Sequence, residues 1–191
     1  MTRHFGSAIK GVTLRSGPYT SQGEFMISKH GLEGGGIYAV SRGLREGHDL
    51  CIDLLPDKSI DQINASLKQR KPKDSFVNVL RKTLRLGPEK IALLMEFAHP
   101  LPNDIAPLLK KLEITGAMLR PIDEAISTAG GVRFDDLSNW LELKQTPSVF
   151  ACGEMLDWEA PTGGYLLTAC LSTLRRAAQG ALIALRALKD E

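Results

Sequence analysis

Apolar and polar residues alternate in several stretches near the start of the chain, and the period then becomes helical. The alternating stretches are residues 11–14, 24–28 and 50–54. A period of two is typical of half-buried strands, and Ser16-Gly17-Pro18 supplies a turn between the first two stretches. Ile37, Val40 and Leu44 have helical spacing instead. We therefore expect a hairpin or meander, a short helix that starts near Gly36, and a further strand.

Residues 59–112 carry apolar residues at helical spacing in four short stretches. Ser59-Ile60-Asp61-Gln62 has the form of a capping box, in which Ser59 accepts from a helix N–H and Gln62 reaches back to the cap. Gly87-Pro88 marks the end of the second helix, and Asn103 is the predicted cap of the fourth. The pattern predicts a compact helical subdomain at residues 59–112, after strands within residues 11–54.

The pattern returns to extended chain after residue 113. Residues 114–119 and a short stretch at Leu141 and Leu143 have strand character, and the apolar run 149–152 lies between Pro147 and Gly153, as in a buried strand. Residues 164–189 then form a predicted helix with one broad apolar face. Gly180, in its middle, indicates close packing at that point.

Candidate chemistry clusters at the start of this last helix. Glu154 is an acid at the end of the predicted strand, and Pro161-Thr162-Gly163-Gly164 opens the helix. Free N–H groups at a helix start favour a phosphate or another electron-rich group. The residue types alone leave two interpretations open, a ligand site or a plain turn with a surface acid.

Three segments together resemble a known family. Ala151-x-Gly153-Glu154 followed by Gly163-Gly164-Tyr165 is similar to the carboxyl-terminal flavin motif of aminoacetone-oxidase-like bacterial FAD flavoproteins. The segment 127–132, Ser-Thr-Ala-Gly-Gly-Val, resembles their glycine-rich loop near the flavin ring. Gly31-Leu32-Glu33-Gly34 resembles a motif of the domain that they insert into their FAD fold. These flavoproteins belong among the NAD(P)/FAD-dependent oxidoreductases.

The resemblance implies roles for seven residues. Gly153 and Glu154 would meet the ribityl and pyrophosphate part of FAD, with the carboxylate accepting from a ribityl hydroxyl. Three more, Gly163, Gly164 and Tyr165, would set the helix end under the pyrimidine side of the ring. The remaining two, Gly130 and Gly131, would line the opposite approach, where a substrate or nicotinamide could enter.

The same resemblance implies an α+β fold. An inserted strand-and-helix domain at residues 1–112 would precede the carboxyl-terminal part of a Rossmann-type FAD-binding domain at residues 113–191. No G-x-G-x-x-G turn, which holds the FAD pyrophosphate in such domains, occurs in these 191 residues. One departure from the family is Leu174, where its helix normally has glycine.

The implied function is that of the carboxyl-terminal portion of an FAD-dependent oxidoreductase. FAD would be the cofactor, NAD(P)H a possible electron donor, and the partners a small-molecule substrate or the amino-terminal half of an FAD domain. No residue is a convincing acid, base or nucleophile, which suits a protein whose cofactor does the redox chemistry. The alternative is a non-enzymatic remnant or interaction module that uses the helical subdomain and the basic residues 68–73.

Composition and residue spacing bear on nucleic-acid binding, membrane insertion, secretion and metal binding. Lys and Arg number 24 against 22 Asp and Glu, so the net charge of +2 gives no reason to expect nucleic-acid binding. No run approaches the roughly 20 apolar residues of a membrane span, and the first residues do not resemble a signal peptide. The cysteines and histidines lack ligand spacing, so we expect no metal site. These features together predict a cytoplasmic protein.

Overall fold

The computed structural model describes residues 1–69, 74–159 and 164–189. The chain divides into two compact units, Met1–Leu119 and Arg120–Glu191. Each unit is considered by itself below. The first unit therefore keeps residues 113–119, which the sequence analysis assigned to the second domain; the predicted insertion of one domain into another stays a prediction.

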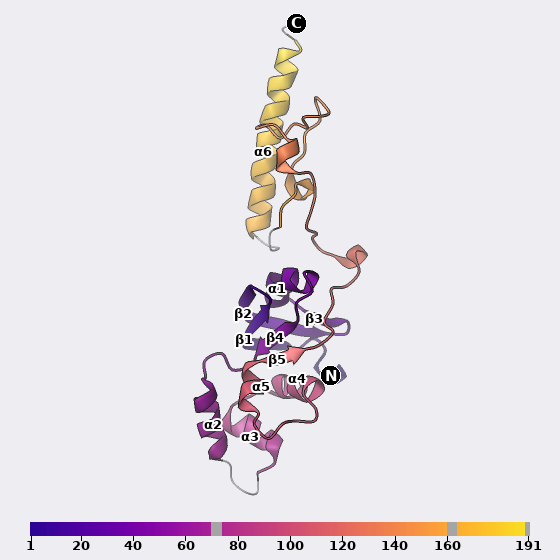
Figure 1. The fold of residues 1–191 in the computed structure, drawn as a ribbon. Helices are drawn as coiled ribbons and strands as arrows, with labels where there is room; N and C mark the ends of the chain where they lie inside the picture. Colours follow the sequence, from indigo (N-terminus) through magenta and orange to yellow (C-terminus); the bar gives the residue numbers. More distant parts are fainter. Residues whose placement is uncertain (70–73, 160–163, 190–191) are drawn as a thin grey trace. The chain divides into compact units, whose positions relative to one another are not determined.

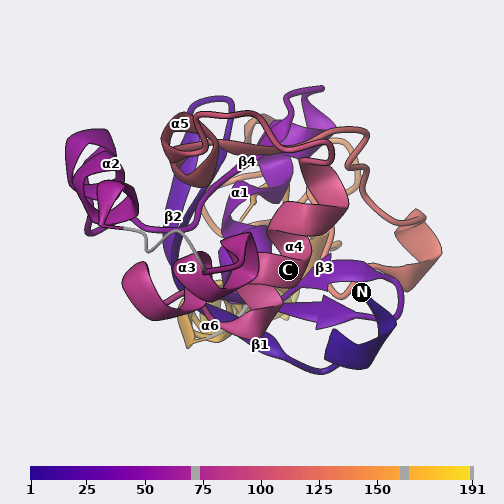
Figure 2. The same ribbon diagram turned by 90° about the horizontal axis from the view of Figure 1, so that it is seen from below.

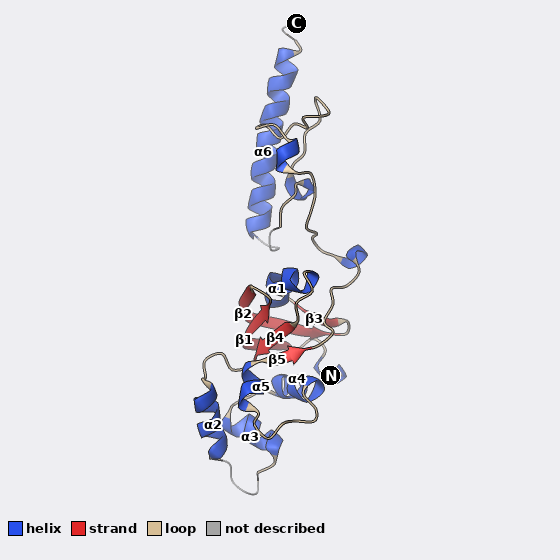
Figure 3. Ribbon diagram, in the orientation of Figure 1, coloured by secondary structure: helices blue, strands red, loops and turns tan. Residues whose placement is uncertain are grey.

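The first unit contains an antiparallel sheet (Figures 1 and 3). Its strands are β1 (Ala8–Ser16), β2 (Tyr19–Ser28), β3 (Gly31–Glu33), β4 (Leu50–Asp53) and β5 (Leu112–Ile114). They lie in the order β3-β2-β1-β4-β5, and each neighbouring pair is antiparallel. The predicted hairpin is confirmed as β1–β2, and the predicted strand at residues 50–54 is confirmed as β4.

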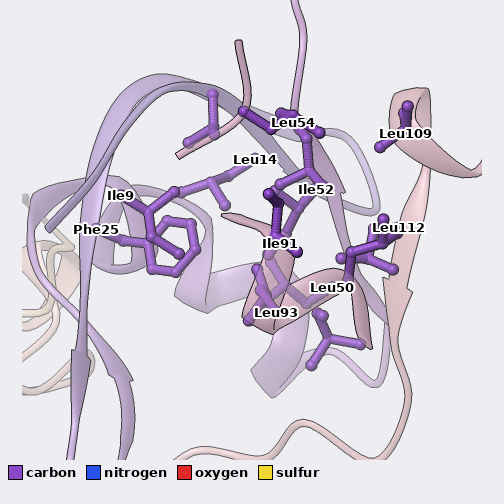
Figure 4. Close-up of a cluster of buried hydrophobic side chains, with 14 of the residues drawn as sticks. Ile9, Leu14, Phe25, Leu50, Ile52, Leu54, Ile91, Leu93, Leu109 and Leu112 are labelled. Carbon is purple, nitrogen blue, oxygen red and sulfur yellow. The ribbon is translucent and has the colours of Figure 1, made fainter. Parts of the chain in front are cut away.

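Alternation along the strands gives the sheet one buried row and one exposed row across β1, β4 and β5. Ile52 pairs with Leu14 on one side and Leu112 on the other, and all three are buried. In the next row Arg15 and Glu113, which flank Cys51, are exposed. Figure 4 shows the buried row in one cluster with residues of the helix α4. Burial of this row fixes the register, since a slip by one residue would expose it.

The helices of this unit match the helical periods of the sequence. They are α1 (Gly35–Arg45), α2 (Ile60–Lys68), α3 (Phe76–Thr83), α4 (Pro88–Phe97) and α5 (Ala106–Lys110), with a short 3-10 turn at Thr2–His4. In Figure 1, α2 to α5 gather at one end of the unit and α1 at the other; Figure 2 views this arrangement from below. The predicted capping box at Ser59 and Gln62 is confirmed, with both reciprocal hydrogen bonds present.

The predicted cap of the last of these helices was wrong. The N-cap of α5 is Ile105, and Asn103 lies outside the helix. Asp104 caps the helix start instead, because its Oδ1 accepts a hydrogen bond of 3.1 Å from the N–H of Ala106. A side-chain oxygen two residues before that N–H satisfies it as well as a regular cap would.

A buried ion pair ties α5 to the end of β4. The Asp53 side chain is only 5% exposed, and its Oδ2 lies 2.7 Å from Nζ of Lys110. Lys110 also donates to the carbonyl of Leu55 at 2.8 Å. Nearby, Lys90 of α4 donates to the carbonyls of Gly11 and Leu54. Burial lowers the pKa of Lys90, and the nearby carboxylate of Asp53 opposes that shift.

The second unit is built around one long helix. Its elements are the 3-10 turns η2 (Ile122–Glu124), η3 (Phe134–Asp136) and η4 (Gly153–Met155) and the helix α6 (Gly164–Ala187). Figure 1 shows the irregular segment alongside α6. Within the described residues of the chain, no helix is both long enough and apolar enough to cross a membrane.

The strands predicted in this half were wrong in place or in kind. The strand expected at residues 114–119 lies earlier in the chain: β5 covers Leu112–Ile114 and pairs with β4. Residues 149–152 form only a single bridge, between Phe150 and Glu142. The reason is local: Leu141 and Ser148 have φ values of 64° and 67°, which turn the chain back on itself where a strand would need extended backbone. The run instead faces residues 141–143: the N–H of Leu143 donates to the carbonyl of Val149, and the N–H of Ala151 donates to the carbonyl of Leu141.

The ion pair generates a stability prediction. We expect Lys110→Met to lower the free energy of unfolding of the first unit by about 3 kcal/mol, because it leaves the buried Asp53 carboxylate without its direct partner. Lys111→Met is the matched control, because Lys111 pairs with Glu113 on the exposed row, and it should cause no measurable loss. Urea unfolding followed by far-UV circular dichroism measures both. Equal stability of the two variants would contradict the role given to Asp53.

Candidate functional site

One face of α6 is made of small residues that let the irregular segment pack closely. Ala177 and Gly180 are buried. A Cβ built on Gly180 would stand 2.6 Å from Cβ of Trp140 and 2.9 Å from the ring of Phe150. Only glycine allows that approach. The close packing predicted at Gly180 is therefore confirmed, and it fixes residues 140–150 against the helix.

A small apolar cluster fills the space between helix and loops. Its buried members are Leu137, Leu141, Ala151, Leu156 and Ala177. Ala151 belongs to the run predicted as a buried strand, so its burial was predicted correctly although its backbone conformation was not. Because Ala151 and Leu156 both belong to this cluster with Ala177 of α6, the residues between them are held close to the helix.

The two predicted flavin segments meet through their backbones. The N–H of Val132 donates to the carbonyl of Met155, and the N–H of Asp157 donates to the carbonyl of Val132, both at 2.8 Å. This pairing is a parallel bridge between Val132 and Leu156. We call it the 132–156 junction. It joins the glycine-rich loop to η4, although the two are more than 20 residues apart in the chain.

Gly131 makes the junction sterically possible. Its φ is +152°, and a Cβ on it would stand 2.3 Å from the carbonyl oxygen of Met155. No real Cβ tolerates such a distance, and the oxygen belongs to backbone that the junction itself fixes. A side chain at this position would therefore push the two segments apart.

Ser127 fixes the orientation of Glu154. Its Oγ donates to Oε1 of Glu154 at 2.7 Å, across 27 positions of sequence. Glu154 is exposed, and Oε2 has no hydrogen-bond donor among the described residues. A carboxylate accepts through both oxygens. Glu154 thus presents a positioned, open acceptor at the surface of the unit.

Gly153 connects this acceptor to α6. Its N–H donates to Oγ1 of Thr173 at 3.0 Å, and its carbonyl accepts from Nε1 of Trp158 at 3.1 Å. The hydroxyl of Thr173 in turn donates to backbone carbonyls of its own helix. These hydrogen bonds hold the first residue of the turn η4 from both sides, and Glu154 is the second residue of that turn.

The structure brings some of the predicted site residues together and leaves others apart. Gly131, Gly153 and Glu154 meet around the 132–156 junction, with Gly130 beside them and exposed. Gly164 and Tyr165 form the first turn of α6, as predicted, and both are exposed. Neither makes a hydrogen bond to the junction within the described part of the chain. Gly163 lies outside the described residues.

Sequence reasoning missed the residues that hold these groups in place. The sequence analysis includes Ser127 only as part of the glycine-rich loop and gives no role to Thr173 or Trp158. A hydroxyl before a glycine pair and a hydroxyl within an apolar helical face are weak signals. Their partners are 20 or more residues away for Ser127 and Thr173, so spacing alone could not reveal them.

A second face of α6 carries exposed leucines. Its members, the leucine stripe, are Leu167, Leu171, Leu174, Leu182 and Leu185, which are 52% to 66% exposed. They are separated by four, three, eight and three residues, so they lie in one row along the helix. The described residues of the second unit do not cover this row. It includes Leu174, the position at which the sequence departs from the resembled family.

The 132–156 junction generates a prediction for a glycine pair. We expect Gly131→Ala to destabilise the second unit far more than Gly130→Ala does. Gly130 has φ +96° and open space around it, so its alanine variant pays only backbone strain, about 1–2 kcal/mol. Both tryptophans of the chain, Trp140 and Trp158, lie in this unit, so thermal unfolding followed by tryptophan fluorescence reports on it. Equal losses of thermal stability in the two variants would mean that the close contact between Gly131 and the Met155 carbonyl does not determine the stability of this unit.

Comparison of the sequence with known proteins identifies the family of the chain. A family model described as the HI0933-like protein Rossmann domain matches residues 2–180. The chain is also 27% identical over 165 residues to the 3-dehydro-bile acid delta(4,6)-reductase of Clostridium scindens. That alignment covers 76% of this chain and 40% of the reductase, so the chain spans less than half the length of this curated relative. With nearly the whole chain matched, the protein belongs to the HI0933-like family of FAD-binding, Rossmann-domain flavoproteins.

Proposed function

We propose that the second unit supplies the ring-facing part of the FAD site of an oxidoreductase. The observation that carries this proposal is the 132–156 junction, which brings Gly131 and Gly153 next to a positioned Glu154. Family membership and the reductase relative support an oxidoreductase-like flavoprotein in general. The finer resemblance to aminoacetone-oxidase-like proteins belongs to this proposal.

The residues present fit FAD by their chemistry. Oε2 of Glu154 is an open acceptor for a ribityl hydroxyl, while Ser127 occupies Oε1 and keeps the carboxylate from rotating. Gly130 is exposed and without a side chain, so it offers room for a flat ring. The exposed start of α6 at Gly164 offers backbone N–H groups to an electron-rich edge. When bound, FAD would accept an electron pair from a reduced substrate or NAD(P)H and pass it onward.

The reductase relative narrows the kind of reaction. Its name describes reduction of a bile acid, which is a small organic molecule. We propose that this chain likewise takes part in electron transfer to or from a small organic substrate. The chain's own residues would orient the cofactor and leave one side of it open beside Gly130 and Gly131.

We further propose that another polypeptide segment covers the leucine stripe. Contiguous exposed apolar residues on a helix mark a surface for protein contact. The segment we expect is the strand, G-x-G-x-x-G turn and helix of an amino-terminal FAD-domain half, since the relative is much longer than the stretch that matches this chain. In this arrangement FAD binding by the present chain alone is weak.

The alternative function is a non-enzymatic interaction module, and the leucine stripe favours it as well. The basic residues 68–73, which the sequence analysis considered as part of such a surface, lie partly outside the described residues. Flavin binding separates the two functions, because an interaction module has no reason to bind FAD through Glu154.

The first prediction from this proposal concerns FAD itself. Titration of the full chain with FAD, followed by quenching of flavin fluorescence, should show weak but saturable binding. Glu154→Gln should weaken it about tenfold, because it removes the charge from a hydrogen-bonded acceptor. Asp135→Asn removes one negative charge from an 85% exposed side chain of the same unit and should leave binding unchanged. Absence of saturable binding, or equal affinities of both variants, would refute the proposed site.

The second prediction concerns the leucine stripe. The chain should bind a dye that fluoresces on apolar surfaces, and Leu171→Lys combined with Leu182→Lys should remove roughly half or more of that signal. Ser172→Lys combined with Gln179→Lys adds the same charges on the polar face of α6 and should not reduce it. Both double variants should keep the helical circular dichroism of the parent, since the four side chains are exposed. A dye signal that is equal in the two double variants would place the apolar surface elsewhere.

A further inference from the structure

A hollow of about 390 Å³ lies on the polar face of α6. Trp140, Ser172, Arg175, Arg176 and Gln179 line it. None of the seven predicted cofactor residues is among them, so the hollow is separate from the proposed FAD contacts. Its lining combines an aromatic ring, two guanidinium groups, a hydroxyl and an amide.

Arg176 is held in place before any ligand arrives. Its Nε donates to the backbone carbonyl of Asn139, and its guanidinium carbon lies 6.0 Å from the centroid of the Trp140 ring. The Cβ and the carbonyl oxygen of Trp140 pack closely against Gly180, which positions the base of that side chain. The terminal nitrogens of Arg176 thus have a defined position, which lowers the entropy cost of using them.

The two arginines of the hollow lack a carboxylate partner in the part of the chain that the structure describes. Among the described residues, no carboxylate lies within 4.0 Å of Arg175 or Arg176. The helix itself contributes none, since α6 contains no Asp or Glu. Two neighbouring cations that lack a carboxylate partner attract an anion more strongly than either would alone.

We propose that this hollow binds a phosphate group, either free or carried by a nucleotide. Guanidinium groups donate paired hydrogen bonds that match the geometry of phosphate oxygens. The amide of Gln179 can donate a further hydrogen bond, and Ser172 can accept one while its hydroxyl donates to Thr168. Trp140 is 42% exposed, so part of its ring is open to a base.

Isothermal titration calorimetry of the full chain at low salt tests this proposal. Inorganic phosphate and ADP should bind saturably, and adenosine should not. Arg175→Gln should weaken both about tenfold, since a charge-assisted pair is lost. Arg186→Gln removes the same charge from an exposed position of α6 outside the hollow and should change neither. Tighter binding of ADP than of phosphate, reduced by Trp140→Ala, would identify the nucleotide form, and equal affinities the free anion.

Two results would overturn the proposal. One is the absence of saturable phosphate or ADP binding by the parent chain. The other is equal weakening by Arg175→Gln and Arg186→Gln, which would mean a general effect of net charge. Riboflavin, which carries no phosphate, separates the two sites: Glu154→Gln should weaken its binding and Arg175→Gln should not. Failure of the FAD site therefore leaves the phosphate result interpretable, and the reverse also holds.

Discussion

The candidate site depends on one backbone pairing, between Val132 and the residues on either side of Leu156. Two hydrogen bonds and the missing side chain of Gly131 bring a glycine-rich loop against a turn that carries a carboxylate. Without this junction, Glu154 would be an ordinary surface acid. With it, Ser127 is near enough to bind one carboxylate oxygen and leave the other open.

The helix α6 converts that local pairing into a rigid unit. Its small residues, Ala177 and Gly180, let the loops approach closely. The hydroxyl oxygen of Thr173 accepts a hydrogen bond from the N–H of Gly153. The same helix carries three different surfaces: the packed face, the leucine stripe and the polar face with its arginines. Anything that binds one of these surfaces also restricts the helix from which the others project.

Local patterns predicted the first unit and the helix α6 well and the irregular segment before α6 poorly. The hairpin, the helix near Gly36 and the capping box at Ser59 are encoded within a few neighbouring residues, so periodicity and cap chemistry reveal them. The run at residues 149–152 is different. Ala151 is buried in a cluster with Ala177 of α6, whereas Val149 is 44% exposed, and turns at Leu141 and Ser148 with positive φ precede the run. Glycine positions in the site could be predicted from motif resemblance, whereas Ser127 and Thr173 act through contacts that only the folded chain creates.

The two units differ in how completely they bury their apolar residues, and this bears on function. In the first unit the paired row Leu14, Ile52 and Leu112 is almost fully buried by its own helices. In the second, leucines along α6 stay exposed, and the turn η4 depends on that same helix. A partner seated on the leucine stripe would hold α6, and α6 holds Gly153 through Thr173. In the proposed arrangement, a partner on the leucine stripe would therefore act, through α6, on a turn whose own hydrogen bonds are already formed.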